Sequence, residues 1–210
     1  MLSDTLSLSL YYTFDSHDFV ISETWQIDDE WVIDDKVLQI IGIGESVEIK
    51  CKVTTVWDEA AWAVTITGDS RVFAKNICCI GVDSIDILDN STLWMDGCEL
   101  RQSLSSIRVA EKGNIHVKSC KFSGTGSADP AISIENDGEQ QCLANIIGCR
   151  FGTFSPCIES TVPVRCIGCI FGQNLGSVVC IDKAKRQQFL DQSVFKGNVF
   201  ESTILDICTM

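Results

Sequence analysis

Short stretches of this chain alternate strictly between apolar and polar residues. Isoleucine, valine or alanine recurs at every second position in SIDIL (84–88), SIRVA (106–110), NIHVK (114–118) and AISIE (131–135). An amphipathic helix repeats its apolar positions about every 3.6 residues, whereas a period of two places successive side chains on opposite faces of a strand. The pattern therefore predicts many short β-strands, each with one buried face.

One arrangement of residues recurs along these strands. It has a cysteine at its centre, an apolar residue three places earlier and another two places later. The central column contains Cys98, Cys120, Cys149 and Cys169, with Asn198 in the last copy. The earlier column contains Met95, Val117, Ile146, Cys166 and Phe195, and the later column contains Leu100, Phe122, Phe151, Phe171 and Phe200. Successive copies are 22, 29, 20 and 29 residues apart, which indicates one repeating unit with loops inserted in some copies.

A repeat of this length that is built from strands and turns predicts a solenoid, in which each coil stacks on the last. Equivalent side chains would lie about 4.8 Å apart along the axis and form internal ladders. Cysteine suits such a ladder because it is small and apolar, and phenylalanine can fill the interior beyond a corner. We expect Gly124, Gly152 and Gly172 to adopt the positive φ of a tight turn. We assign residues 1–18 to an N-terminal lead-in or cap and residues 19–210 to the solenoid.

The stretch from Phe19 to Cys51 carries a more specific pattern. Its apolar and glycine positions are Trp25, Ile27, Val32, Ile33, Val37, Leu38, Ile40, Gly42, Gly44, Val47 and Ile49. Their order resembles the first coils of right-handed parallel β-helix proteins of the pectin-lyase-like superfamily. The resemblance implies an all-β, right-handed, single-stranded parallel β-helix of roughly eight coils.

Within that superfamily the chain resembles a non-enzymatic branch on Gly42 to Ile49 and on Val117 to Phe122. The branch contains the adenoviral large early-region tumour protein and a related adenovirus capsid-surface protein. The β-helix domains of eukaryotic cytokinesis and ubiquitin-ligase adaptors look similar. The resemblance implies a non-catalytic structural or protein-interaction β-helix, first of all a viral capsid-surface or host-interaction protein. The alternatives are an intracellular adaptor and a carbohydrate-binding or polysaccharide-cleaving β-helix.

The net charge of the chain limits the kinds of partner that it is expected to bind. The 29 acidic and 16 basic residues among 210 leave a formal net charge of −13, which repels phosphate backbones and anionic membrane surfaces. Protein, cation or neutral-sugar partners are therefore expected, and nucleic acid and membranes are not. The first residues lack a basic segment followed by a long apolar one, so we expect an intracellular protein, in cytoplasm or nucleus and in virions, that no signal peptide directs to secretion.

The sequence contains no recognisable motif for catalysis or for metal binding. The Asp28-Asp29 and Asp34-Asp35 pairs fit solvated turns better than the paired carboxylates of glycoside hydrolysis. The Cys166-x-x-Cys169 spacing could suggest zinc, but Cys166 falls in an apolar column, so a buried core residue is the better interpretation. A chain of this size has a core without disulfides, so the twelve cysteines are expected to be reduced. We expect no catalytic residue, cofactor or metal.

Candidate contact residues are Trp57, Trp62 and Trp94, which could form an interaction surface for protein or sugar. The alternative is that the tryptophans shield the open N-terminal end of the solenoid from water. The chain ends in the apolar, alternating sequence FESTILDICTM without a polar cap. Because an open solenoid end exposes strand edges and apolar interior, self-association, for example as a homotrimer, would cover it.

Overall fold

The structure of the protein is a computed structural model. It describes residues 16–22, 25–27, 31–43, 47–51, 63–82, 84–103, 107–124, 129–135, 143–152, 154, 156–172, 178–180, 184 and 186–201. Two of the predicted contact residues, Trp57 and Trp62, lie outside these ranges.

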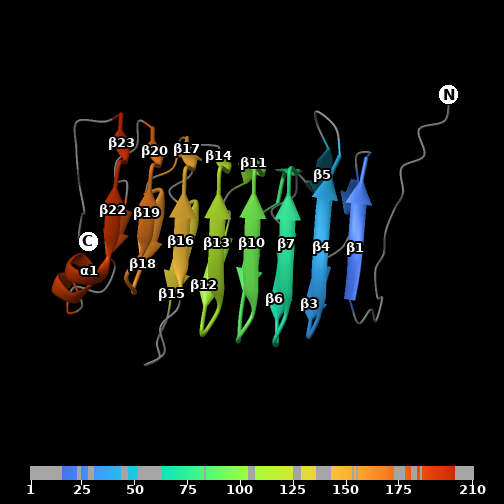
Figure 1. Cartoon of the computed structure of the whole chain (residues 1–210), viewed down its shortest axis with the longest axis horizontal. Helices are drawn as coiled ribbons and strands as arrows, with labels where there is room; N and C mark the ends of the chain where they lie inside the picture. The colour runs from blue at the N-terminus through green and yellow to red at the C-terminus, as the bar shows by residue number, and fades with distance from the viewer. Residues whose placement is uncertain are drawn as a thin grey trace.

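The strands form three parallel sheets that run the length of the molecule (Figure 1). Sheet B contains β1 (Ser16–Ile21), β4 (Val37–Gly42), β7 (Arg71–Lys75), β10 (Thr92–Asp96), β13 (Asn114–Lys118), β16 (Ala144–Ile147), β19 (Arg165–Ile167) and β22 (Val194–Lys196). Sheet A contains β2 (Trp25–Ile27), β5 (Glu48–Cys51), β8 (Cys78–Ile80), β11 (Glu99–Ser103), β14 (Lys121–Gly124), β17 (Arg150–Phe151), β20 (Ile170–Phe171) and β23 (Val199–Phe200). Sheet C contains β3 (Trp31–Asp34), β6 (Ala63–Thr67), β9 (Ser84–Ile87), β12 (Ile107–Ala110), β15 (Ile132–Glu135), β18 (Ile158–Ser160) and β21 (Val178–Cys180).

The chain visits sheets B, A and C in turn, and each strand pairs with the strand three positions further along. In Figure 1 the strands of sheet B point upward on the near side, the chain returns on the far side, and successive coils advance from right to left. That winding is right-handed. The predicted right-handed parallel β-helix is confirmed, with eight strands each in sheets A and B. Because β1 begins at Ser16, the first strand starts inside the predicted lead-in.

The interior is a set of apolar ladders, one residue from each coil. Cys98, Cys120, Cys149 and Cys169 are buried at the corner between sheets B and A. Leu100, Phe122, Phe151, Phe171 and Phe200 are paired in register along sheet A. The rings from Phe122 to Phe200 stack with centroids 4.9, 5.1 and 5.0 Å apart. The spacing equals the distance between neighbouring strands, so the backbone itself sets the stacking of the rings.

The positions of the left-handed residues differ from the prediction. Gly97, Gly148 and Gly168, with φ of 65°, 62° and 62°, come directly before the cysteine column, where the chain turns from sheet B to sheet A. Gly124, Gly152 and Gly172 do not have positive φ, so that expectation was wrong. Two of these glycines instead allow a close approach of backbone. A Cβ at Gly172 would lie 2.9 Å from the carbonyl oxygen of Phe151, and one at Gly152 would lie 3.1 Å from that of Phe122.

One described helix, α1 (Arg186–Gln192), lies between β21 and β22 in the last described coil. Its Phe189 is buried and its Leu190 packs against the core. In the described part of the chain no helix has the length and apolar character that a membrane span requires.

Candidate interaction surface on sheet B

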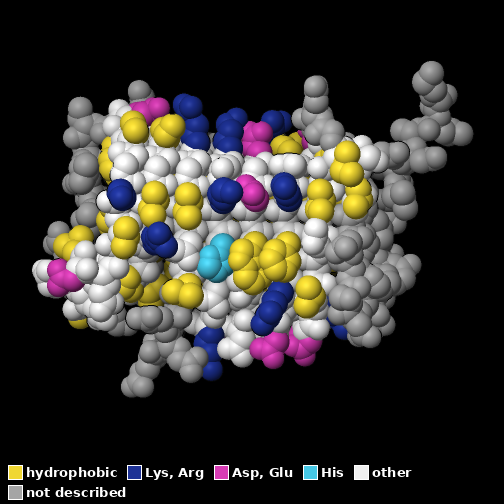
Figure 2. Space-filling model, in the orientation of Figure 1, with side chains coloured by type: hydrophobic (Ala, Val, Ile, Leu, Met, Phe, Trp, Pro, Cys, Tyr) yellow, Lys and Arg dark blue, Asp and Glu magenta, His cyan; other side chains and the backbone are white. Residues whose placement is uncertain are grey.

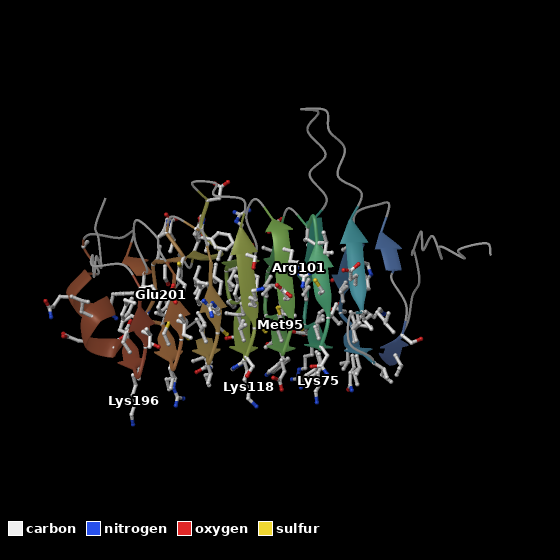
Figure 3. All side chains as sticks on the ribbon, turned by 90° about the horizontal axis from the view of Figure 1, so that it is seen from above. Lys75, Met95, Arg101, Lys118, Lys196 and Glu201 are labelled. Carbon is white, nitrogen blue, oxygen red and sulfur yellow. The ribbon has the colours of Figure 1, made fainter. Side chains whose placement is uncertain are left out.

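The outward face of sheet B carries two rows of side chains parallel to the helix axis. Neighbouring strands pair without a shift, so each strand from β4 to β19 contributes one residue to each row. The aromatic row, as we call it, contains Gln39, Phe73, Trp94, His116, Asn145 and Arg165. The charged row, as we call it, contains Ile41, Lys75, Asp96, Lys118, Ile147 and Ile167. Figure 3 shows Lys75 and Lys118 projecting from the same side of the β-helix, while Met95 lies inside it.

Three rings of the aromatic row form one stack. The ring centroids of Phe73 and Trp94 are 4.4 Å apart and those of Trp94 and His116 are 5.4 Å apart, both with an interplanar angle of 7°. The Nδ2 atom of Asn145 lies 3.1 Å from Nδ1 of His116 and extends the row. Both faces of Trp94 are covered by its neighbours, so the stack presents ring edges to its surroundings. Burial in the stack lowers the pKa of His116.

A groove of about 570 Å³ lies between the two rows. One wall is formed by the aromatic row, and the other by the charged row from Ile41 to Ile147. In Figure 2 this face is turned to the viewer, with the histidine beside the apolar patch at its centre and basic side chains around them. A groove in this position runs across the strands, along the axis of the β-helix.

The cations of this face are poorly neutralised. Lys118 Nζ lies 3.9 Å from Asp96 Oδ2, and both side chains are largely exposed. Arg71, Lys75 and Arg165 form no ion pair with any acidic side chain that the structure describes. The face is therefore basic, although the whole chain carries a net charge of −13.

Sheet A differs because its charges are paired. Glu99 accepts hydrogen bonds from Arg101 at 2.6 Å and from Lys121 at 2.7 Å, and Arg150 lies 3.6 Å from Glu201. The hydrogen bond from Arg101, followed by the contact with Lys121, lowers the pKa of Glu99 to about 2 against the opposing effect of burial. These charged side chains are therefore neutralised by neighbours on the same sheet.

The outward face of sheet C is acidic. It presents Asp34, Asp86, Glu135 and Glu159, with Arg108 as the basic exception among its described side chains. Burial, then the charges of Glu135 and Asp129, raise the pKa of Glu159.

Exposed apolar side chains also concentrate on sheet B. Of the nine exposed large hydrophobic side chains that the structure describes, five lie on its strands, namely Val20, Val37, Phe73, Ile147 and Val194, and a sixth, Leu143, directly precedes β16. Phe73 and Ile147 line the groove, so apolar area is available there to a partner.

Trp94, one of the predicted contact residues, lies at the centre of this surface and is half-buried by the stack. Sequence reasoning missed Phe73 and the partnership of Trp94 with His116. A signal was present, because Trp94, His116, Asn145 and Arg165 each stand four places before a residue of the cysteine column.

The cysteines serve the core. Cys166 and Cys169 are both fully buried, and burial raises the pKa of Cys166 to about 12, so its thiol stays protonated near neutral pH. The eight cysteines whose side chains are described are all reduced thiols. Across the described ranges, His, Cys, Asp and Glu form no group of three or more that could hold a metal ion.

The remaining guide to identity is comparison with known proteins. No protein-family model, no curated protein and no solved structure matches this chain.

Proposed function

We propose that this protein is a non-catalytic β-helix that binds a protein partner through the outward face of sheet B. One observation carries the proposal: stacked aromatics, exposed aliphatic side chains and cations with no close ion pair among the described side chains gather on one face. Aromatic residues and arginine are enriched in the cores of protein interfaces. Among the described side chains of the other two sheets this combination does not occur, since those of sheet A are ion-paired and those of sheet C are mainly acidic.

The scaffold suits such a role. Every strand of sheet B between β1 and β22 is held by backbone pairing to its neighbours, so the side chains of the face keep a fixed spacing. A preorganised surface loses little conformational freedom on binding, which raises affinity.

A photo-crosslinking amino acid at Ile147, in the charged row, tests the proposal in cells that naturally contain the protein. We expect a crosslink to a polypeptide from Ile147 and none from the control position Arg108 on sheet C. Trp94→Ala should weaken the crosslink from Ile147. Equal crosslinking from both positions, or none from Ile147, would contradict the proposal.

The alternative of carbohydrate binding rests on the partial exposure of Trp94 alone. Binding of an uncharged glycan that Trp94→Ala abolishes would favour this alternative over a protein partner.

The viral and adaptor roles implied by the resemblance remain predictions, and they differ in assembly. Light scattering after gel filtration separates them: a concentration-independent homotrimer favours a capsid-surface role, and a monomer favours an adaptor.

A further inference from the structure

We infer that the groove between the aromatic and charged rows holds an extended, acidic segment of a partner protein. The inference rests on the proposed function and specifies the kind of partner. It follows from the shape, the charge and the ring orientation of the groove.

The shape of the groove fits a single extended chain. Its lining comes from six consecutive strands of sheet B, β4 to β19. Five strand spacings of about 4.8 Å give a length of about 24 Å. A fully extended peptide advances about 3.3 Å per residue, so about seven residues would span the groove. The two rows stand two residues apart on each strand, a separation of about 6.6 Å, which one extended chain can occupy.

The charge of the groove selects an acidic segment. Lys75, Lys118 and Arg165 line it, and Asp96 is its acidic residue. Carboxylates placed between these cations would gain charge-assisted hydrogen bonds, which none of the described acidic side chains makes with them, Asp96 lying 3.9 Å from Lys118. On either side of the three charged residues of this row, Ile41 and Ile147 line the groove and would contact apolar side chains of the same segment.

The orientation of the rings favours a peptide over an anionic polysaccharide. A sugar ring packs its apolar face on the face of an aromatic ring, but the faces of Trp94 are occupied by Phe73 and His116. The ring edges that remain carry partial positive charge. Such edges suit carboxylate and carbonyl oxygens, both of which an acidic peptide provides.

Fluorescence anisotropy with synthetic probes tests the inference. The first probe is a labelled heptapeptide in which glutamate and valine alternate, and the second has glutamine in place of every glutamate. Soluble polygalacturonate serves as competitor in a third titration. We expect the glutamate peptide to bind in a salt-sensitive manner, the glutamine peptide to bind at least about tenfold more weakly, and polygalacturonate to compete poorly.

Two triple variants localise the binding. Lys75→Gln, Lys118→Gln and Arg165→Gln together should weaken binding of the glutamate peptide about tenfold. The matched control, Arg101→Gln, Lys121→Gln and Arg150→Gln on sheet A, removes the same charge and should leave the affinity within about twofold. Equal losses in both variants, equal binding of the glutamine peptide, or tighter binding of polygalacturonate would each overturn the inference.

The failure of this inference is distinct from failure of the proposed function. If Ile147 crosslinks to a polypeptide while the glutamate peptide does not bind, sheet B is an interface but its partner is not an acidic linear segment. If Ile147 also gives no crosslink, both the inference and the proposed function are wrong.

Discussion

At the scale of single residues, the corner between sheets B and A depends on a left-handed backbone. The residue before the cysteine column is glycine in four coils and Ser119, with φ of 53°, in another. In the coil of β7 and β8 the column position is Ile77, and Asn76 before it also has φ of 53°. A Cβ at Gly168 or Gly197 would have no atom within 4 Å, so space does not require glycine there. The requirement is conformational, since L-residues other than glycine are strained in this region and asparagine is the best tolerated.

Gly168→Ala should therefore destabilise the protein by about 1 kcal/mol, and Gly168→Asn by less. The measurement is urea unfolding followed by circular dichroism. Equal losses from alanine and asparagine would show that backbone strain is not the cause.

His116 should make stability depend on pH. Its pKa in the folded protein is lowered from 6.5 by burial, so as the pH falls below about 6.5 the unfolded chain takes up a proton first. The free energy of unfolding should decrease through that window and level off below the folded pKa, with no contribution from this group at higher pH. His116→Asn should remove this component. NMR titration of the imidazole would check it, and a pKa at or above 6.5 would contradict it.

At the scale of elements, the strands are short, and ladders between coils hold them together. Phe151 is fully buried between Phe122 and Phe171, whereas Phe200 is partly buried and stacks on Phe171 in the last described coil. In a solenoid each coil is stabilised by its immediate neighbours, so an internal position has two interfaces to lose.

Phe151→Ala should cost about 3–5 kcal/mol of stability and Phe200→Ala clearly less. Chemical denaturation of both variants beside the wild type is the measurement. Equal losses of stability in the two variants would show that contacts with neighbouring coils do not determine how much each phenylalanine contributes.

At the scale of the whole molecule, three faces share one core but differ in charge. Sheet A is neutralised by ion pairs, sheet C is acidic, and sheet B is basic and apolar. A basic face on an acidic molecule orients an approaching anionic partner, and this steering weakens with salt.

The core itself is packed unevenly. An apolar cavity of about 60 Å³ lies in the N-terminal half, lined in part by Trp31, Ala74 and Val82. Ala74 occupies the column that holds Ile40 and Met95 in the neighbouring coils, so its small side chain leaves space.

Ala74→Val should fill part of this cavity and stabilise the protein by about 0.5–2 kcal/mol. Ala144→Val is the matched control, because Ala144 is buried in register with Ile115 and does not line the cavity. In Ala144→Val the extra methyl groups should lower the stability of the protein by about 1–3 kcal/mol. Thermal unfolding measures both, and a destabilised Ala74→Val would show that the cavity cannot accept them.

The sequence by itself determined the strands, the repeat and the inward columns. The inward columns, such as those of Cys98 and Phe171, are apolar in nearly every coil because each residue meets its own copy in the next coil, and this shared requirement is readable in one sequence. The tertiary structure decided the rest. Outward positions share no such requirement, so Phe73, Trp94 and His116 form a stack only because the register of β7, β10 and β13 aligns them. The sequence-based prediction also placed the left-handed corner at the wrong glycines. Gly168 is needed for its positive φ and Gly172 for a close approach of backbone, and only the path of the backbone distinguishes these two roles.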